Sequence, residues 1–148
     1  MGSPDPERGR NVHAGAWTPS VQPELCESGY HLTDNPRKWW WYDNTTAYLV
    51  EFKGEVEGSF DYFDPTPDRK ISVESCRLLR PLTAEELAGY NVFIDGEHTI
   101  NGEDYAVACG TAHVTTTGSS MLTALGYVCV DARDNSSVYA HNGVVVTA

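Results

Sequence analysis

The chain of 148 residues has no long apolar run and little positive charge. No hydrophobic stretch approaches the ~18 residues of a membrane-spanning helix, and residues 1–16 contain no apolar core of a secretion signal. The sequence has 10 Lys and Arg residues and 21 Asp and Glu residues, and its net charge is −11. Such an acidic surface repels the phosphates of nucleic acids and anionic lipids. We therefore expect neither a nucleic acid nor a membrane as partner.

Cysteine is present but not in the patterns of metal modules or disulfide scaffolds. The four cysteines form no C-x-x-C pair, which a standard zinc module would have. Four cysteines in 148 residues are also too few for a disulfide scaffold. We therefore expect free thiols, no bound metal and no cofactor.

An eight-residue repeat runs from Tyr105 to Ala148. Its even positions carry mostly small apolar residues, whereas its odd positions are mixed and often polar. Alternation with a period of two indicates β-strands, and a short fixed repeat indicates a repeat architecture. The second and fourth positions hold Ala106, Val114, Leu122, Val130, Val138 and Val146, and Ala108, Thr116, Ala124, Ala132, Ala140 and Ala148.

Two architectures compete for this repeat. In a meander of hairpins, the residues that flank each two-residue turn would share a face, so the even positions would change faces from strand to strand. In a solenoid, every octad turns the same way and all even positions can face one interior. Because the even set stays small and apolar, the sequence favours a short β-solenoid or β-roll. It also places the odd residues Cys109, Cys129, His113, Tyr139 and His141 on the outside.

Three regions are predicted, in a mainly β protein. Residues 1–23 are rich in Pro, Gly and charge and are expected to form an N-terminal arm. Residues 24–104 are expected to form a small α+β unit with two short helices, and residues 105–148 the solenoid. Within the middle region, the sequence predicts helices after Asp34-Asn35-Pro36 and Thr83, strands over 46–56 and 70–82, and a hairpin at Asp95-Gly96 between 90–94 and 97–100.

Aromatic residues are the main candidates for a contact surface. Trp39, Trp40 and Trp41 follow the first predicted helix start, and consecutive helical residues point about 100° apart. At most two of these three side chains can therefore share a face. The cluster is either part of the core and its edge, or a surface that binds a sugar or a partner by stacking. Tyr62 and Phe63 lie in an acidic, aromatic loop and are further contact candidates.

Cys26 and His31 are the weak candidates for chemistry. A cysteine and a histidine five residues apart could form a thiolate–imidazole pair or part of a metal site. The alternative is a structural turn in which the histidine bonds backbone groups. The sequence shows no third residue that would orient such a pair.

The segment Cys26-Glu27-Ser28-Gly29-Tyr30-His31-Leu32 resembles a family of uncharacterised domains in phage and actinobacterial proteins. The resemblance covers Asn11 to Leu87 and includes strands similar to 49–54 and 77–80, and family members continue into Val/Ala repeats. It implies a viral or bacterial origin, in a virion or a host cytoplasm, but no activity. The octads are also similar in style to the β-rolls of trimeric adhesin heads, whose repeats are longer.

A fainter resemblance links the chain to ADP-ribosyltransferases. Gly29-Tyr30-His31 followed by Val50-Glu51 is similar to their strand signatures, in which an aromatic residue or His holds the nicotinamide cofactor and a Glu polarises the ribose. The resemblance would make His31 and Glu51 site residues. Glu51 comes earlier in the chain than in that family, and no Ser-Thr-Ser element is present.

Together these patterns predict a non-enzymatic structural or binding protein, such as a capsid decoration protein of a phage particle. The octads reach Val146 without a polar cap, and repeat arrays normally need caps at their ends. We therefore expect a homo-oligomer, with a trimer as the first expectation, or incorporation into a larger assembly. The alternative is a small phage or bacterial effector enzyme, ADP-ribosyltransferase-like or based on Cys26 and His31.

Overall fold

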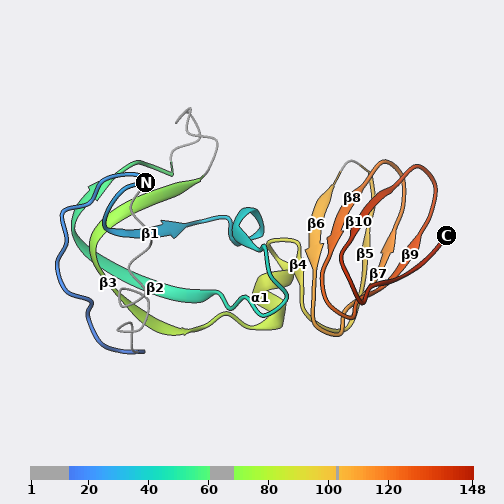
Figure 1. The fold of residues 1–148 in the computed structure, drawn as a ribbon, viewed down its shortest axis with the longest axis horizontal. Helices are drawn as coiled ribbons and strands as arrows, with labels where there is room; N and C mark the ends of the chain where they lie inside the picture. The colour runs from blue at the N-terminus through green and yellow to red at the C-terminus, as the bar shows by residue number, and fades with distance from the viewer. Residues whose placement is uncertain (1–13, 61–68, 103) are drawn as a thin grey trace. The chain divides into compact units, whose positions relative to one another are not determined.

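A computed structural model describes residues 14–60, 69–102 and 104–148 of the chain (Figure 1). The protein is mainly β and its C-terminal part is a β-solenoid, as the repeat predicted. The chain forms two compact units. The first, here called the sheet unit, comprises Met1–Asp34 and Ala47–Pro81, and the second, the solenoid unit, comprises Asn35–Thr46 and Leu82–Ala148. These units differ in extent from the predicted ranges 24–104 and 105–148, because Asn35–Thr46 and Leu82–Asp104 belong with the repeat.

The sheet unit is built on three antiparallel strands. They are β1 (Tyr30–Thr33), β2 (Tyr48–Glu57) and β3 (Lys70–Pro81), in the order β1-β3-β2. The last two strands confirm the runs predicted over 46–56 and 70–82. A small core forms around Ile71, Val73 and Cys76, against which Tyr30, Leu32, Val50 and Phe60 pack.

Residues 15–21 lie along β3 and are not part of a free arm, so this part of the predicted 1–23 arm is wrong. The amides of Gly15, Thr18 and Val21 donate to the carbonyls of Leu78, Cys76 and Glu74 at 2.8, 2.8 and 3.0 Å. The physical reason is that β1 pairs only with Lys70–Val73, so the rest of that edge of β3 needs other partners. Residues 1–13 lie outside the described part of the chain.

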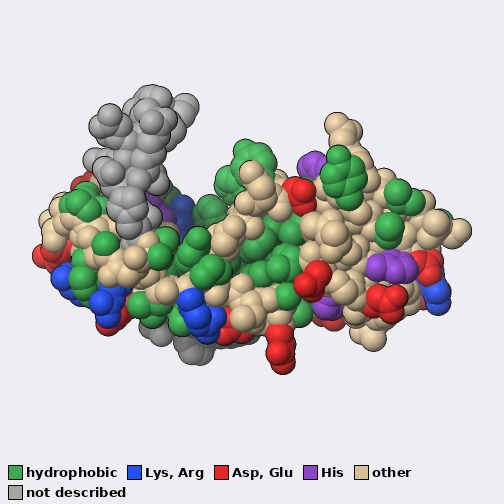
Figure 2. All heavy atoms as spheres, turned by 90° about the horizontal axis from the view of Figure 1, so that it is seen from below, with side chains coloured by type: hydrophobic (Ala, Val, Ile, Leu, Met, Phe, Trp, Pro, Cys, Tyr) green, Lys and Arg blue, Asp and Glu red, His purple; other side chains and the backbone are tan. Residues whose placement is uncertain are grey.

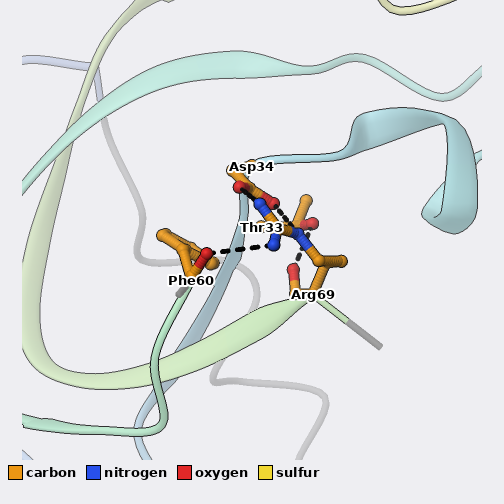
Figure 3. Close-up of polar contacts among 4 residues, drawn as sticks. All are labelled: Thr33, Asp34, Phe60 and Arg69. Atoms are coloured by element: carbon orange, nitrogen blue, oxygen red, sulfur yellow. Dashed lines mark hydrogen bonds and ion pairs between the residues drawn. The ribbon is translucent and has the colours of Figure 1, made fainter. Parts of the chain in front are cut away.

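Arg69 joins the end of β1 to the start of β3 (Figure 3). Its guanidinium pairs with the Asp34 carboxylate and donates to the Phe60 carbonyl at 2.9 Å, while the Thr33 hydroxyl donates to the Arg69 carbonyl at 2.6 Å. Asp34 is thus engaged in an ion pair. The N-cap of the following helix is Asn35, whose side chain makes no capping bond.

The solenoid unit consists of eight short strands in two parallel sheets, ordered β10-β8-β6-β4 and β11-β9-β7-β5. The strands are β4 (Val92–Phe93), β5 (Glu97–Ile100), β6 (Tyr105–Ala108), β7 (His113–Thr116), β8 (Met121–Ala124), β9 (Cys129–Ala132), β10 (Ser137–Ala140) and β11 (Val145–Thr147). Tyr105 pairs with Met121, and Met121 with Ser137. Each coil is therefore two octads long, and the solenoid makes about three turns.

The hairpin predicted at Asp95-Gly96 is wrong. β4 pairs in parallel with β6 and β5 with β7, so the two strands that flank Asp95-Gly96 belong to different sheets. The Asp-Gly pair forms a corner of the first coil. Stacking on the next coil satisfies the backbone of both strands and also buries Phe93 and Ile100 in the shared core, which an isolated hairpin could not do.

The even positions of the first octads face the interior, as predicted. Ala106, Val114, Leu122 and Val130 are at most 2% exposed and belong to one continuous core. Polar residues at even positions are also buried where a partner exists: the Thr116 hydroxyl lies 2.7 Å from that of Ser136. The small side chains of the even set allow the two sheets to pack closely along the whole stack.

Both predicted helices are present and short. The 3-10 helix η1 (Pro36–Trp39) has Pro36 in its first turn, and α1 (Ala84–Ala88) follows a complete capping box between Thr83 and Glu86. Leu87 is buried, and Ala88 packs against the solenoid core. Neither helix has the length that crossing a bilayer requires, and no other helix in the described residues does.

Candidate association surface

The Cys26–His31 pair forms a structural turn in the sheet unit. Cys26 has φ 70, and its backbone amide donates to Nε2 of His31 at 2.9 Å. Partial burial, with the nearby positive charge of Lys70, lowers the pKa of His31, and a hydrogen bond to the Glu24 backbone opposes this shift. Nε2 therefore serves the backbone of Cys26 and is not directed at its thiol.

Glu51 is placed away from this pair. It lies on β2 opposite Arg77, whose guanidinium contacts its carboxylate at 2.5 Å, whereas His31 lies on β1 opposite Ser72. β3 lies between β1 and β2, so Glu51 and His31 are two strand spacings of about 4.8 Å apart across the sheet. They are also offset by several residues along β3. The structure therefore does not bring together the two residues that the ADP-ribosyltransferase resemblance would require.

The three tryptophans occupy different environments, as predicted, but they do not share a helix, because η1 ends at Trp39 and Trp40 and Trp41 follow it. Trp40 is 4% exposed, Trp41 is 62% exposed, and Trp39 is intermediate, with its ring centroid 5.6 Å from that of Trp41. The indole N–H of Trp41 donates to the Lys38 carbonyl at 3.1 Å. Trp41 and Tyr42, which is 70% exposed, are thus available to a partner, while Trp40 belongs to the core.

Cys109 was predicted to face outward but is only 2% exposed, so this prediction is wrong. The segment Asn35–Thr46 covers the outer face of the solenoid at β6. Trp40 is buried beside the Cys109 thiol, and Asp43 accepts from the Gly110 amide at 2.9 Å. Burial raises the pKa of Cys109, against the opposing effect of the Trp40 contact.

A sequence signal for this cover existed. The odd residues Val107 and Cys109 of the first octad are apolar. Two coils later, the same positions hold Tyr139 and His141, which are exposed. Apolar residues at odd positions of the early coils, such as Cys109 and Leu125, which are 2% and 4% exposed, indicate that another part of the chain packs there. The predictions for Cys129, His113, Tyr139 and His141 are confirmed, since all four are exposed.

Val146 lies in the last described coil of the solenoid, formed by β10 and β11 and here called the open end. β10 bonds only β8 and β11 bonds only β9 among the described residues, so each strand has one free edge. Val145 and Val146 are 58% and 43% exposed, while Val138 and Val144 are only partly covered by the core. The end thus presents unpaired backbone groups together with apolar side chains.

Two other candidates lie outside the described residues. Tyr62 and Phe63 fall within 61–68, which the structure does not describe.

Within the described residues, no group of three or more His, Cys, Asp or Glu side chains could hold a metal ion. Hydrophobic side chains also interrupt the polar surface on the face drawn in Figure 2. The open end combines apolar side chains with free strand edges. The edge strand β2 does so too, since it bonds β3 on one side and carries four apolar side chains that are 38–45% exposed: Tyr48, Leu49, Phe52 and Val56.

Comparison with protein-family models, with curated proteins and with solved structures found no match to this chain.

Proposed function

We propose that this chain is a structural protein that self-associates through the open end of its solenoid, as a component of a larger assembly such as a phage particle. The observation that carries the proposal is the last described coil, in which Val145 and Val146 are exposed and β10 and β11 each bond a strand on one side only among the described residues. Free strand edges are templates for pairing with another chain. A second copy of the chain can supply strands to these edges.

The two ends of the solenoid differ, and this difference restricts the mode of association. α1 lies at the first coil, where it packs beside β4 and Ala88 contacts the core, so that end presents a different surface from the last coil. Two copies can instead join their open ends about a two-fold axis, with the last strands antiparallel. Such a contact is self-complementary and closes on itself without forming fibres.

A dimer is therefore the smallest assembly that satisfies the free edges. The trimer expected from the sequence would bury the apolar ends around a three-fold axis. It would not let the last strands of two copies pair with each other, so their edges would stay free. The assignment to a phage particle is supported by the resemblance over residues 11–87, and the net charge of −11 would keep the unassembled protein soluble.

Sedimentation of the 148-residue chain at micromolar concentration tests the proposal. We expect a dimer for the unmodified protein and a monomer for Val146→Asp, because the new charge would be buried in the joined ends. Tyr139→Asp is the matched control, since Tyr139 is 59% exposed on the outer face of the same coil and the substitution adds the same charge.

The pattern of results separates the possibilities. A strictly monomeric unmodified chain would overturn self-association. A trimer dissociated by Val146→Asp would keep the proposed surface but replace the two-fold arrangement. Dissociation by both variants to the same extent would show that charge alone, and not the open end, controls association.

A further inference from the structure

Three chemically distinct side chains form a row across the outer face of the sheet β11-β9-β7-β5. Glu97 on β5 pairs in register with His113 on β7, and His113 pairs with Cys129 on β9. Adjacent strands lie about 4.8 Å apart, so the three side chains are immediate neighbours. All three residues are exposed, and the next residues on β7 and β9, Val114 and Val130, point into the core. The row therefore consists of a carboxylate, an imidazole and a thiol on one open surface.

The orientation of the His113 ring places its second nitrogen on the side of β9. Nδ1 of His113 lies 4.0 Å from Oε1 of Glu97. The two ring nitrogens lie on opposite sides of the Cβ–Cγ axis, so a ring whose Nδ1 is directed at β5 presents the Nε2 side to β9, where Cys129 is placed. At this distance the two groups are at ion-pair range and not hydrogen-bonded, so Glu97 contributes to positioning the ring and does not fix its tautomer.

The surroundings of Cys129 leave the thiol accessible. Asp131, two residues further along β9, pairs with Arg133 at 2.5 Å, so these two charges largely offset each other. On the other side of Cys129 the neighbouring residue is Val145 of β11, which carries no charge. The charged or titratable groups around the thiol are thus His113, Glu97 and the Asp131–Arg133 pair.

We propose that Cys129 is a modification site that takes low-molecular-weight disulfides by thiol–disulfide exchange, with His113 as its base and Glu97 as the residue that positions His113. Nε2 of His113 accepts the thiol proton, and the Cys129 sulfur attacks one sulfur of the disulfide. The disulfide bond of the reagent breaks as the mixed disulfide forms, and the departing thiolate takes the proton from His113. One disulfide is consumed and one is formed, so the step needs no further oxidant.

The other three cysteines provide internal controls. Cys26 is exposed, but the nearby His31 already accepts the backbone amide of Cys26 through Nε2. Cys76 and Cys109 are buried, and burial raises the pKa of both thiols. Cys129 differs from all three because it combines exposure with an imidazole in register beside it.

The experiment exposes the full chain to oxidised glutathione and, separately, to iodoacetamide, and follows each cysteine by peptide mass spectrometry. We expect Cys129 to react about tenfold faster than Cys26 near neutral pH, which is a modest effect for a positioned base. His113→Gln should reduce the Cys129 rate to that of Cys26 and leave the Cys26 rate unchanged. Glu97→Gln should give a smaller reduction, and the control His141→Gln, on the opposite sheet, should give none.

A pH profile distinguishes base catalysis from simple accessibility. In the unmodified chain, the ratio of the Cys129 rate to the Cys26 rate should vary with pH, and His113→Gln should abolish this variation while the Cys26 profile stays the same. The proposal is overturned if Cys129 reacts no faster than Cys26. It is equally overturned if His113→Gln changes neither the rate nor the pH profile of Cys129.

Discussion

The two ends of the solenoid are made from one repeat but differ in how they are covered. Val114, Val130 and Val146 occupy equivalent positions in three successive coils and are 0%, 2% and 43% exposed. The first coils are covered by α1 and by the segment Asn35–Thr46, whereas no described strand stacks beyond β10 and β11. The comparison shows that burial in a stacked repeat depends on the neighbouring coils and not on the repeat sequence.

The largest expected effect comes from placing a charge at the three equivalent valines. Val114→Asp and Val130→Asp would each bury an unpaired carboxylate and should cost several kcal/mol, a typical penalty for such a charge. Val146→Asp should have little effect on the stability of the isolated chain, and Asp131→Val on the outer face of β9 should be mild. Thermal and urea denaturation of the dilute protein would measure these differences, and equal shifts at all three valines would contradict the burial gradient.

The next prediction concerns the cover over β6. Trp40→Ala should cost about 3–5 kcal/mol, as large-to-small core substitutions do, because Trp40 is buried against Cys109. Trp41→Ala should cost less than about 0.5 kcal/mol, as exposed positions usually do. Reactivity of Cys109 toward iodoacetamide gives an independent measurement, since only loss of Trp40 should expose this thiol. If both substitutions were equally harmless, Trp40 would not be the cover.

A matched pair of turn glycines tests how closely the coils approach one another. Gly102 and Gly110 have φ 69 and φ 61, so alanine is strained at both. A Cβ on Gly110 would lie 2.4 Å from the Ile94 carbonyl oxygen, whereas a Cβ on Gly102 would meet nothing within 4 Å. Gly110→Ala should therefore cost ~1–3 kcal/mol more than Gly102→Ala, in the range of overpacked sites. Equal free energies of unfolding would show that the first coils can separate freely.

The smallest expected effect extends the comparison to the sheet unit. His31 has a lowered pKa, so its neutral form is favoured in the folded state. Its contribution to stability is complete above the unfolded-state pKa of about 6.5 and is lost as the pH falls through the lower folded-state pKa.

Urea denaturation of the unmodified chain and of His31→Gln, at several pH values between about 7.5 and about 5, would measure this contribution. The stability difference between the two proteins should shrink as the medium becomes acidic, because a protonated Nε2 cannot accept the Cys26 amide. A difference that does not vary with pH would show that His31 does not act as this acceptor.

The repeat sequence by itself determined much of the solenoid. The alternation in each octad specified the inward residues, such as Leu122 and Val130, and the outward residues, such as Cys129 and His113. The sequence also predicted the turn residues and the capping box at Thr83. Strand alternation, positive φ and helix capping each depend on a few neighbouring residues, so a local pattern is sufficient to predict them.

Tertiary structure alone decided which segments became partners. It combined two octads into one coil, paired β4 and β5 with β6 and β7 in place of a hairpin, and laid residues 15–21 along β3. It also buried Cys109 at an outward position by packing Trp40 against it. These outcomes depend on backbone hydrogen bonds and apolar contacts between residues far apart in the chain. A short-range sequence pattern specifies that a strand needs a partner, but it does not specify which strand becomes that partner.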